Sequence, residues 1–279
     1  MQLDHRQVLD LLPDRDERGH KGDYGKLLLL CGSRGYTGAA ALAAMGALRC
    51  GGGLVFLGVP ESIYAIEAVK LTEPIVFPLP EENGMLSARA LEDVRRHLKT
   101  ADTVLIGPGL GQSEGTMAVL EAVLREFSGP VVVDADGINL LSTRPELVKE
   151  RNGVTILTPH EGEFRRLGIA ADADRELGAM AAAKELDCIL LRKGHRTVIT
   201  DGEKCYINPT GNPGMAVGGS GDVLAGMIVG LLGQKIPPLE ATACAAWLHG
   251  AAGDRAAQKL GQYAMLPTDM LTQLPDLLK

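Results

Sequence analysis

Short apolar runs alternate along the chain with longer segments of helical character. Continuous Val, Ile and Leu runs are typical of parallel strands that are covered on both faces of a sheet. Strands alternating with helices predict a layered α/β fold with right-handed crossovers. The expected strands are Lys26–Cys31, Leu54–Val59, Thr103–Gly107, Pro130–Asp136, Gly153–Pro159 and Cys188–Gly194.

The segments between these strands predict helices. Gly38–Cys50, with the sequence GAAALAAMGALRC, is apolar on nearly every face, which is typical of a buried helix. Further helices are expected at Ser87–Lys99 and Thr116–Phe127, and ADADRE, near Ala171, is expected to start a charged, Ala-rich helix.

The final part of the chain has a different pattern. Two short runs within Thr197–Pro209 predict an antiparallel hairpin or sheet edge, and Gly221–Lys279 is expected to be mostly helical. The chain contains no repeat and no low-complexity linker, so we expect residues 1–279 to form one domain.

Composition excludes several classes of protein. The formal charge of −7 argues against a basic face for nucleic acid. Five scattered cysteines without ligand spacing predict neither disulfides nor zinc, and they favour a reducing cytoplasm. Neither a signal peptide nor a long apolar run is present, so we expect no membrane span.

A glycine-rich segment before a predicted helix is the main candidate for chemistry. Gly218-Gly219-Ser220-Gly221-Asp222 follows several turn residues and precedes an apolar run. Glycines allow backbone N–H groups to converge on one point, and a helix N-terminus adds unpaired donors and partial positive charge. The segment therefore predicts an anion hole for a phosphoryl group, although it is no Walker A loop.

Asp222 has two interpretations. A lone Asp in a first helical turn is more often a helix cap, but its place directly after GGSG favours a base that takes a proton from an attacking hydroxyl. We expect the helix dipole to keep this carboxylate ionised, which weakens its basicity.

Other segments at predicted strand ends are candidates for ligand contact, because ligands of open α/β sheets bind there. Gly107–Gly111 (GPGLG) is one, and His160 and Glu161 of TPHEGEF, which open a helix, are others. Glu163 is a weaker candidate for placing a metal through water. Lys193 is either a ligand for nucleotide phosphate or a solvated surface charge, and its position alone does not decide between them.

These motifs together resemble those of a known family. HKGDYGK, GSRGYTGAAALAAMGALRCGGGLV, TPHEGEF and NPTGNPGMAVGGSGDVLAGMI occur in this order along the chain, and together they resemble the motifs of the ADP/ATP-dependent NAD(P)H-hydrate dehydratases of the ribokinase-like superfamily. The resemblance covers nearly the whole chain, from about His20 to Leu274. It implies a three-layer α/β/α sandwich with a mostly parallel central sheet.

The family resemblance implies a metabolite-repair reaction. Its members phosphorylate the hydroxyl of hydrated NADH or NADPH at the expense of ADP or ATP, then eliminate phosphate to restore the dinucleotide. The resemblance favours ADP as the co-substrate, Mg²⁺ to bridge the phosphates, a homotetramer and a cytoplasmic location.

Roles follow from the resemblance position by position. It implies that Asp222 is the catalytic base and also contacts the hydrate, and that Gly219, Ser220 and Gly221 form the anion hole. Gly221 would also lie near the nucleotide. The implied nucleotide-phosphate residues are Lys193, Gly194, His195, Arg196 and Thr197, the implied hydrate-binding residues are Ala39, Gly109 and His160, and no protein metal ligand is implied.

Two departures and two alternatives stay open. Many members have Thr where this chain has Ser220, and some carry a preceding epimerase domain that this chain is expected to lack. It would then act on the S form and depend on a separate epimerase for the R form. The alternatives are a ribokinase-like small-molecule kinase, such as a thiazole or hydroxymethylpyrimidine kinase, and a non-catalytic nucleotide sensor.

Overall fold

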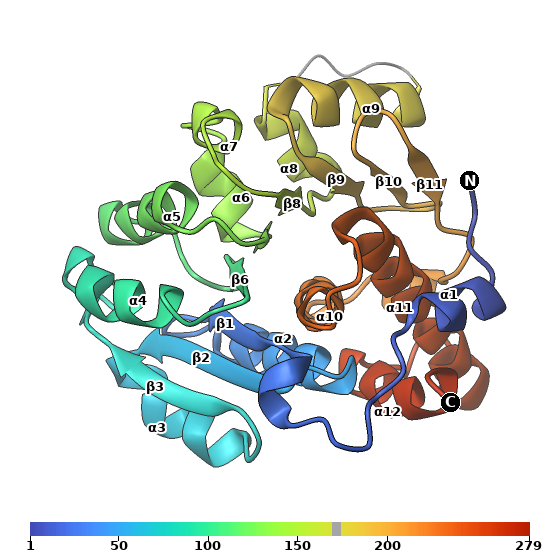
Figure 1. Cartoon of the computed structure of the whole chain (residues 1–279), viewed down its shortest axis with the longest axis horizontal. Coiled ribbons are helices and arrows are strands. Elements are labelled where there is room, and N and C mark those ends of the chain that lie inside the picture. The colour runs from blue at the N-terminus through green and yellow to red at the C-terminus, as the bar shows by residue number, and fades with distance from the viewer. Residues whose placement is uncertain (169–173) are drawn as a thin grey trace.

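The structure, a computed structural model, describes residues 1–168 and 174–279 and is built around a nine-stranded sheet (Figure 1). The strands are β1 (Lys26–Leu30), β2 (Leu54–Pro60), β3 (Ile75–Leu79), β6 (Thr103–Ile106), β7 (Val131–Val133), β8 (Thr155–Leu157), β9 (Ile189–Arg192), β10 (Val198–Thr200) and β11 (Cys205–Ile207). Two further strands, β4 (Glu81–Glu82) and β5 (Met85–Leu86), pair separately.

The strand order across the sheet is β11-β10-β9-β8-β7-β6-β1-β2-β3. From β9 to β3 every pairing is parallel, whereas β10 is antiparallel to both β9 and β11. The mostly parallel sheet and the antiparallel hairpin near its end are therefore confirmed. Parallel strands bring their carboxyl ends to one edge, where the loops that carry the candidate motifs lie.

Helices connect and cover these strands. They are α1 (His5–Leu11), α2 (Thr37–Arg49), α3 (Glu61–Lys70), α4 (Leu91–Leu98), α5 (Glu114–Glu126), α6 (Asp136–Leu141), α7 (Glu146–Lys149), α8 (Glu161–Arg166), α9 (Arg175–Leu186), α10 (Ser220–Gly233), α11 (Pro238–Leu260) and α12 (Pro267–Leu277). Short 3₁₀ turns occur at Lys21–Tyr24, Ala88–Ala90 and Pro213–Met215.

The core is divided into two by the sheet. Successive residues of β1 alternate between the clusters: Leu27 and Leu29 belong to one, and Leu28 and Leu30 to the other. The first cluster includes residues of α1, α2, α3, α10, α11 and α12, and the second those of α4 to α9. This arrangement is the expected three-layer sandwich, and it explains why β1 is apolar at every position after Lys26.

Some expected boundaries were wrong. Strand β7 ends at Val133, three residues before the predicted end, because Ala135 adopts a φ of 50° and α6 begins at Asp136. The edge strand β3, with the sequence IVFPL, was not predicted, since its proline and partly exposed residues weaken the pattern of a central strand. The expected helix start near Ala171 lies outside the described residues, and the described helix begins at Arg175.

The helices α2 and α10 approach each other closely through glycines. A Cβ atom at Gly226 would collide with the carbonyl oxygen of Ala43, and one at Gly46 would lie 2.5 Å from the carbonyl oxygen of Val223. The backbones of the two helices are therefore in direct contact. The first turn of α10 contains the predicted phosphate loop, and the first turn of α2 contains Ala39.

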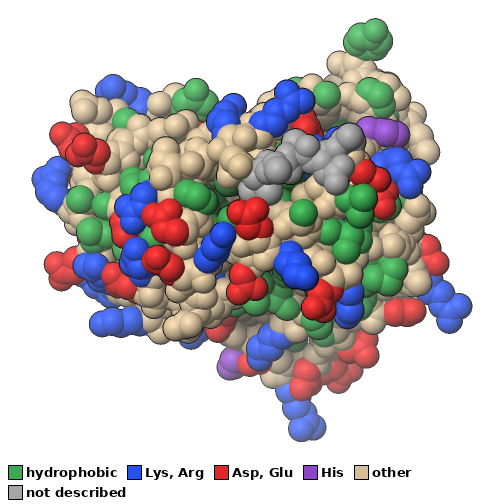
Figure 2. Space-filling view, turned by 90° about the horizontal axis from the view of Figure 1, so that it is seen from above, with side chains coloured by type: hydrophobic (Ala, Val, Ile, Leu, Met, Phe, Trp, Pro, Cys, Tyr) green, Lys and Arg blue, Asp and Glu red, His purple; other side chains and the backbone are tan. Residues whose placement is uncertain are grey.

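The surface carries charges of both signs. On the face drawn in Figure 2, acidic and basic side chains are intermixed. Among the described residues, no helix is long and apolar enough to cross a membrane.

Candidate active site

Two glycine-rich loops meet at the carboxyl ends of neighbouring strands. The Gly32 N–H, after β1, donates to the carbonyl oxygen of Pro108, after β6, over 2.8 Å. The Ser33 hydroxyl donates to the carbonyl oxygen of Gly109, also over 2.8 Å. These bonds join the GSRGYTG and GPGLG loops into one wall.

Two of the predicted hydrate-binding residues lie together in this wall. Gly109 has a φ of +60°, and a Cβ atom added there would lie 2.8 Å from the Cβ of Ala39. The close approach and the left-handed backbone both explain why glycine is needed at this position. The structure thus brings Ala39 and Gly109 together, although their role toward a substrate stays a prediction.

The predicted phosphate loop ends in a helix, as expected. Gly219 has a φ of +97° and is the N-cap of α10, so Ser220, Gly221 and Asp222 occupy its first turn. Because the cap position belongs to Gly219, the interpretation of Asp222 as the helix cap is wrong. Asp222 lies three residues further along, as the third residue of the helix.

A buried ion pair lies beside this turn. The Lys193 ammonium donates to Asp134 Oδ1 over 2.7 Å and lies 4.0 Å from Glu163 Oε2. Asp134 is 1% exposed and also accepts a 2.6 Å hydrogen bond from the Thr158 hydroxyl. A Cβ atom at Gly221 would lie only 3.4 Å from Lys193 Nζ, so the ammonium borders the phosphate loop.

This geometry rules out one of the two interpretations of Lys193, that of a solvated surface charge. Its side chain is 19% exposed, so it is not a solvated surface charge. Burial lowers the pKa of Lys193, but Asp134 and Glu163 raise it by more, and the ammonium remains charged. A fixed positive charge therefore faces the start of α10.

The environment of Asp222 corrects one expectation. Burial and the nearby carboxylate of Asp134 raise the pKa of Asp222 to about 6, although the Lys193 ammonium opposes them. The helix dipole was expected to weaken its basicity, but the loss of water and the like charge have the larger effect. Asp222 is thus a stronger base than an ordinary aspartate and is still mostly ionised at neutral pH.

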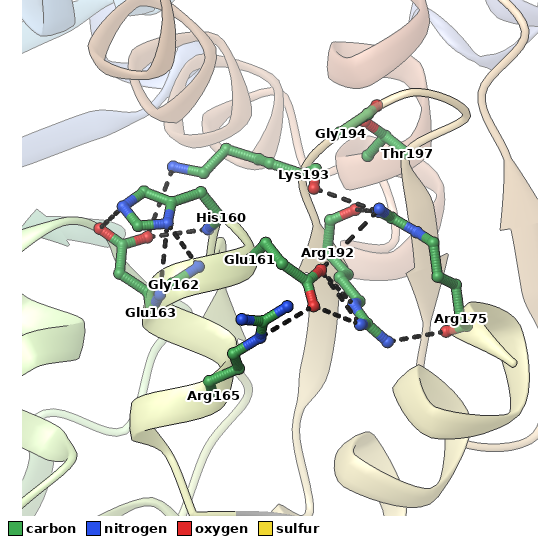
Figure 3. A network of polar contacts seen from close by, with 10 residues as sticks. All are labelled: His160, Glu161, Gly162, Glu163, Arg165, Arg175, Arg192, Lys193, Gly194 and Thr197. Atoms are coloured by element: carbon green, nitrogen blue, oxygen red, sulfur yellow. Dashed lines mark hydrogen bonds and ion pairs between the residues drawn. The ribbon is translucent and has the colours of Figure 1, made fainter. Parts of the chain in front are cut away.

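His160 is the N-cap of α8 and stands at the carboxyl end of β8 (Figure 3). Its Nδ1 accepts from the N–H groups of Gly162 and Glu163 over 2.9 and 3.2 Å. In return, the carboxylate of Glu163 accepts from the His160 N–H over 2.8 Å. The ring is held in place while remaining exposed, so it can meet a ligand.

The residues after Lys193 form an exposed turn between β9 and β10. Gly194, His195 and Arg196 are exposed, and the Thr197 hydroxyl donates to the carbonyl oxygen of Gly194 over 3.0 Å. Arg175 supports this turn from α9, since its guanidinium donates to the carbonyl oxygen of Lys193 over 3.2 Å (Figure 3). Lys193 points inward, whereas Gly194, His195 and Arg196 face outward and Thr197 is half-buried.

Two residues of the site were missed by the sequence analysis. Asp134 was assigned to a strand, although it follows the strand end where a functional residue is expected. His249 lies within α11 and its Nε2 is 2.9 Å from the carbonyl oxygen of Ser220. Nothing in the apolar sequence around His249 indicates that contact.

No group of three or more His, Cys, Asp or Glu side chains among the described residues is arranged to hold a metal ion. Asp134 and Asp136 lie near Asp222 at the start of α10, and the Lys193 ammonium pairs with Asp134 there. This donor set fits a Mg²⁺ ion that arrives with nucleotide phosphates and keeps most of its water.

The chain resembles proteins of known name. Residues 27–276 match the family model described as NAD(P)H-hydrate dehydratase. A bifunctional NAD(P)H-hydrate repair enzyme from Moorella thermoacetica is 47% identical over 275 residues, which cover 96% of this chain and 52% of that protein. The chain spans about half the length of the curated relatives it matches.

Solved structures give the same result. An ADP/ATP-dependent NAD(P)H-hydrate dehydratase from Bacillus subtilis, co-crystallised with ATP and Mg²⁺, has a TM-score of 0.85 and 33% identity, covering 98% of this chain and 96% of that one. A ribokinase-like superfamily protein from Enterococcus faecalis has a TM-score of 0.86 and 27% identity, covering 99% and 94%. With its ribokinase-like fold and a family match that spans most of its length, the chain belongs to the NAD(P)H-hydrate dehydratase family.

Proposed function

We propose that this protein uses ADP or ATP to dehydrate the S form of hydrated NADH and NADPH. One observation carries the proposal in chemical terms. A carboxylate whose pKa is raised to about 6, Asp222, lies in the first turn of a helix that begins with a glycine-rich loop. A base and an anion hole at one place suit the transfer of a phosphoryl group to a hydroxyl.

The first step is a kinase reaction. Asp222 takes the proton of the hydrate's hydroxyl, and that oxygen attacks the terminal phosphorus of the nucleotide. The bond to the bridging oxygen breaks, and AMP leaves from ADP, or ADP from ATP. The N–H groups of Gly219, Ser220 and Gly221 stabilise charge on the transferred group, and Lys193 adds a fixed cation beside Gly221.

The second step is an elimination. The lone pair of the ring nitrogen expels the phosphate, and loss of a ring proton restores the double bond of the reduced nicotinamide. The ring itself supplies the driving electrons, so the step requires no strong protein acid. We assign Ala39, Gly109 and His160 to the hydrate, with Asp222 also in contact with it. The nucleotide is assigned to Lys193–Thr197 and Gly221.

Mg²⁺ belongs to the proposed reaction as the partner of the nucleotide. When bound, the ion would offset the negative charge of the nucleotide phosphates, with Glu163 as the residue that would hold it through water. Asp134 accepts a hydrogen bond from the Lys193 ammonium, and Glu163, on α8, lies 4.0 Å from the same ammonium. These positions suit contact with the ion through water.

The biological setting is also part of the proposal. We place the enzyme in the cytoplasm, where its five free cysteines would stay reduced, and we expect it to act as a homotetramer with residues 1–279 folded as one domain. An epimerase activity that converts the R hydrate to the S form would be its functional partner. Curated relatives named as bifunctional repair enzymes support a link between two repair activities.

The test is a turnover assay with hydrated NADH or NADPH, Mg²⁺, and ADP or ATP in separate reactions. Recovery of the near-ultraviolet absorbance of the reduced nicotinamide, together with release of phosphate, is the expected result. Accumulation of a stable phosphorylated product would instead support a small-molecule kinase. Binding of nucleotide without any turnover would support a sensor.

Replacing the proposed base, Asp222, tests its role in the same assay. Asp222→Asn is expected to lower turnover by about 10²-fold or more, as for loss of a positioned general base. Nucleotide binding, measured by calorimetry, should persist because the backbone N–H groups and Lys193 are unchanged. Turnover equal to that of the native protein would contradict the role of Asp222.

A further inference from the structure

His249 makes a polar contact that the reaction described above does not use. It lies in the middle of the long helix α11, is 7% exposed, and is surrounded mostly by apolar residues of that helix. Its Nε2 is 2.9 Å from the carbonyl oxygen of Ser220 and 3.4 Å from the hydroxyl of the same residue. A carbonyl oxygen only accepts, so Nε2 must carry the proton and donate it.

This bond acts on the phosphate loop through the peptide plane. The carbonyl group of Ser220 and the N–H of Gly221 belong to the same planar, trans peptide unit and point in opposite directions. Fixing the carbonyl oxygen therefore fixes the direction of the Gly221 N–H. That N–H is one of the three donors assigned to the anion hole, and a Cβ atom added at Gly221 would lie 3.4 Å from Lys193 Nζ.

The Ser220–Gly221 peptide unit lies in the first turn of α10, where backbone N–H groups have no acceptor within the helix. Gly219 and Gly221, on either side of Ser220, carry no side chain that could restrain it. Glycines allow a peptide unit to rotate at low cost. A donor that turns away from the phosphoryl group loses most of its electrostatic effect, because the anion hole works by being preorganised.

We propose that His249 is a positioning residue that holds the Ser220–Gly221 peptide unit so that the Gly221 N–H points at the transferred phosphoryl group. This inference rests on the proposed function for its catalytic consequence, but the restraint itself is a property of the free protein. His249 lies on α11, the helix that follows α10 in the chain, and it touches no reacting atom.

The electrostatics of the ring suit this role. Burial lowers the pKa of His249 to about 4, with the Lys193 ammonium also lowering it and the bond to Ser220 opposing the change. The imidazole is therefore neutral at physiological pH, and its single N–H is committed to Ser220. A neutral donor restrains the loop without placing a second positive charge near Lys193.

Three variants separate positioning from packing. His249→Met removes the donor and keeps an apolar side chain of similar size. His249→Gln keeps an N–H donor at about the distance of Nε2 from the backbone. Thr242→Val is the matched control, because Thr242 is also buried in α11 but its hydroxyl donates within the same helix, to the carbonyl oxygen of Pro238 over 2.7 Å.

The first measurement needs no substrate. Nitrogen-15 relaxation of the Gly221 amide should give an order parameter near the rigid value of about 0.85 in the native protein. It should fall toward about 0.6 in His249→Met and remain high in His249→Gln and Thr242→Val. An unchanged, rigid Gly221 amide in a folded His249→Met protein would overturn the inference, even if the native enzyme failed the repair assay.

The second measurement is turnover per folded molecule. We expect kcat to fall about tenfold or more in His249→Met, with the KM for the hydrate little changed, because a misdirected donor weakens the transition state most. His249→Gln should recover most of this loss, and Thr242→Val should retain native kcat. Equal losses in the Met and Gln variants, or an equal loss in Thr242→Val, would show a packing effect and refute positioning.

Discussion

Arg192 and Lys193 are consecutive cations at the end of β9, yet they lie in two different environments. The Arg192 side chain is 4% exposed, stacks on the Phe164 ring at 4.1 Å, and donates to Glu161 over 2.9 Å. Lys193 points to the other side of the strand and meets Asp134 next to the phosphate loop. Figure 3 shows the two side chains diverging from neighbouring backbone positions.

One strand end therefore serves both the stability of the fold and the candidate site. Successive side chains of a strand point to opposite faces, so a shift of one residue exchanges the two environments. Arginine suits the first, because its planar group can stack and bind a carboxylate with several donors. Lysine suits the second, because a compact charge can serve a carboxylate and a phosphate in turn.

The largest effect should come from Lys193→Met. The loss of the cation leaves Asp134 and Asp222 as facing carboxylates, which raises the pKa of Asp222 and removes positive charge from the phosphate loop. We expect kcat/KM to fall by about 10²- to 10³-fold, as for loss of a donor to the transition state. Steady-state kinetics check this, and a loss below tenfold would place Lys193 outside the reaction.

Arg192→Met should mainly lower stability and leave turnover nearly unchanged, the opposite of what we expect for Lys193→Met. It leaves Glu161 without its main partner and removes the stack on Phe164, so the free energy of unfolding should fall by about 2–3 kcal/mol. Turnover per folded molecule should stay within about threefold of native. Urea denaturation and active-site titration separate the two quantities, and a loss of turnover as large as that of Lys193→Met would end the distinction between the two cations.

The smallest effect concerns pH. Because the base must be ionised, kcat/KM should rise with pH through about 6, the pKa to which burial and Asp134 raise Asp222. Asp134→Asn removes the like charge, so the acid limb should move to lower pH by about one unit. In the control Glu161→Gln, the limb should not move. If the kcat/KM–pH profiles of all three proteins had the same acidic side, the titrating group would be one other than Asp222.

The sequence was sufficient for the elements and for the loops, but not for the partners inside the site. Continuous apolar runs predicted β1, β2, β6, β8 and β9 to within a few residues, since burial on both faces leaves a strong pattern. The glycines predicted the turn before α10, because the backbone freedom of glycine is a property of the residue itself and depends on no distant contact.

The contacts that set the chemistry are not local. Asp134 lies 59 residues from Lys193, and His249 lies 29 residues from Ser220. Only the order of the strands and the packing of α11 on α10 bring these pairs together. The raised pKa of Asp222 depends on the same long-range packing, which is why the helix dipole alone gave the wrong direction.

The glycine contact between α2 and α10 has a consequence for how such a chain can vary. The first turn of one helix carries Ala39 and that of the other carries Asp222, and their spacing depends on backbone atoms that touch near Gly226 and Gly46. An added methyl group at either glycine would separate the two turns without altering any polar atom. Substitutions at this contact between α2 and α10 are therefore limited by the size of the side chain alone. A larger residue there would lower activity, although it would change no residue of the site.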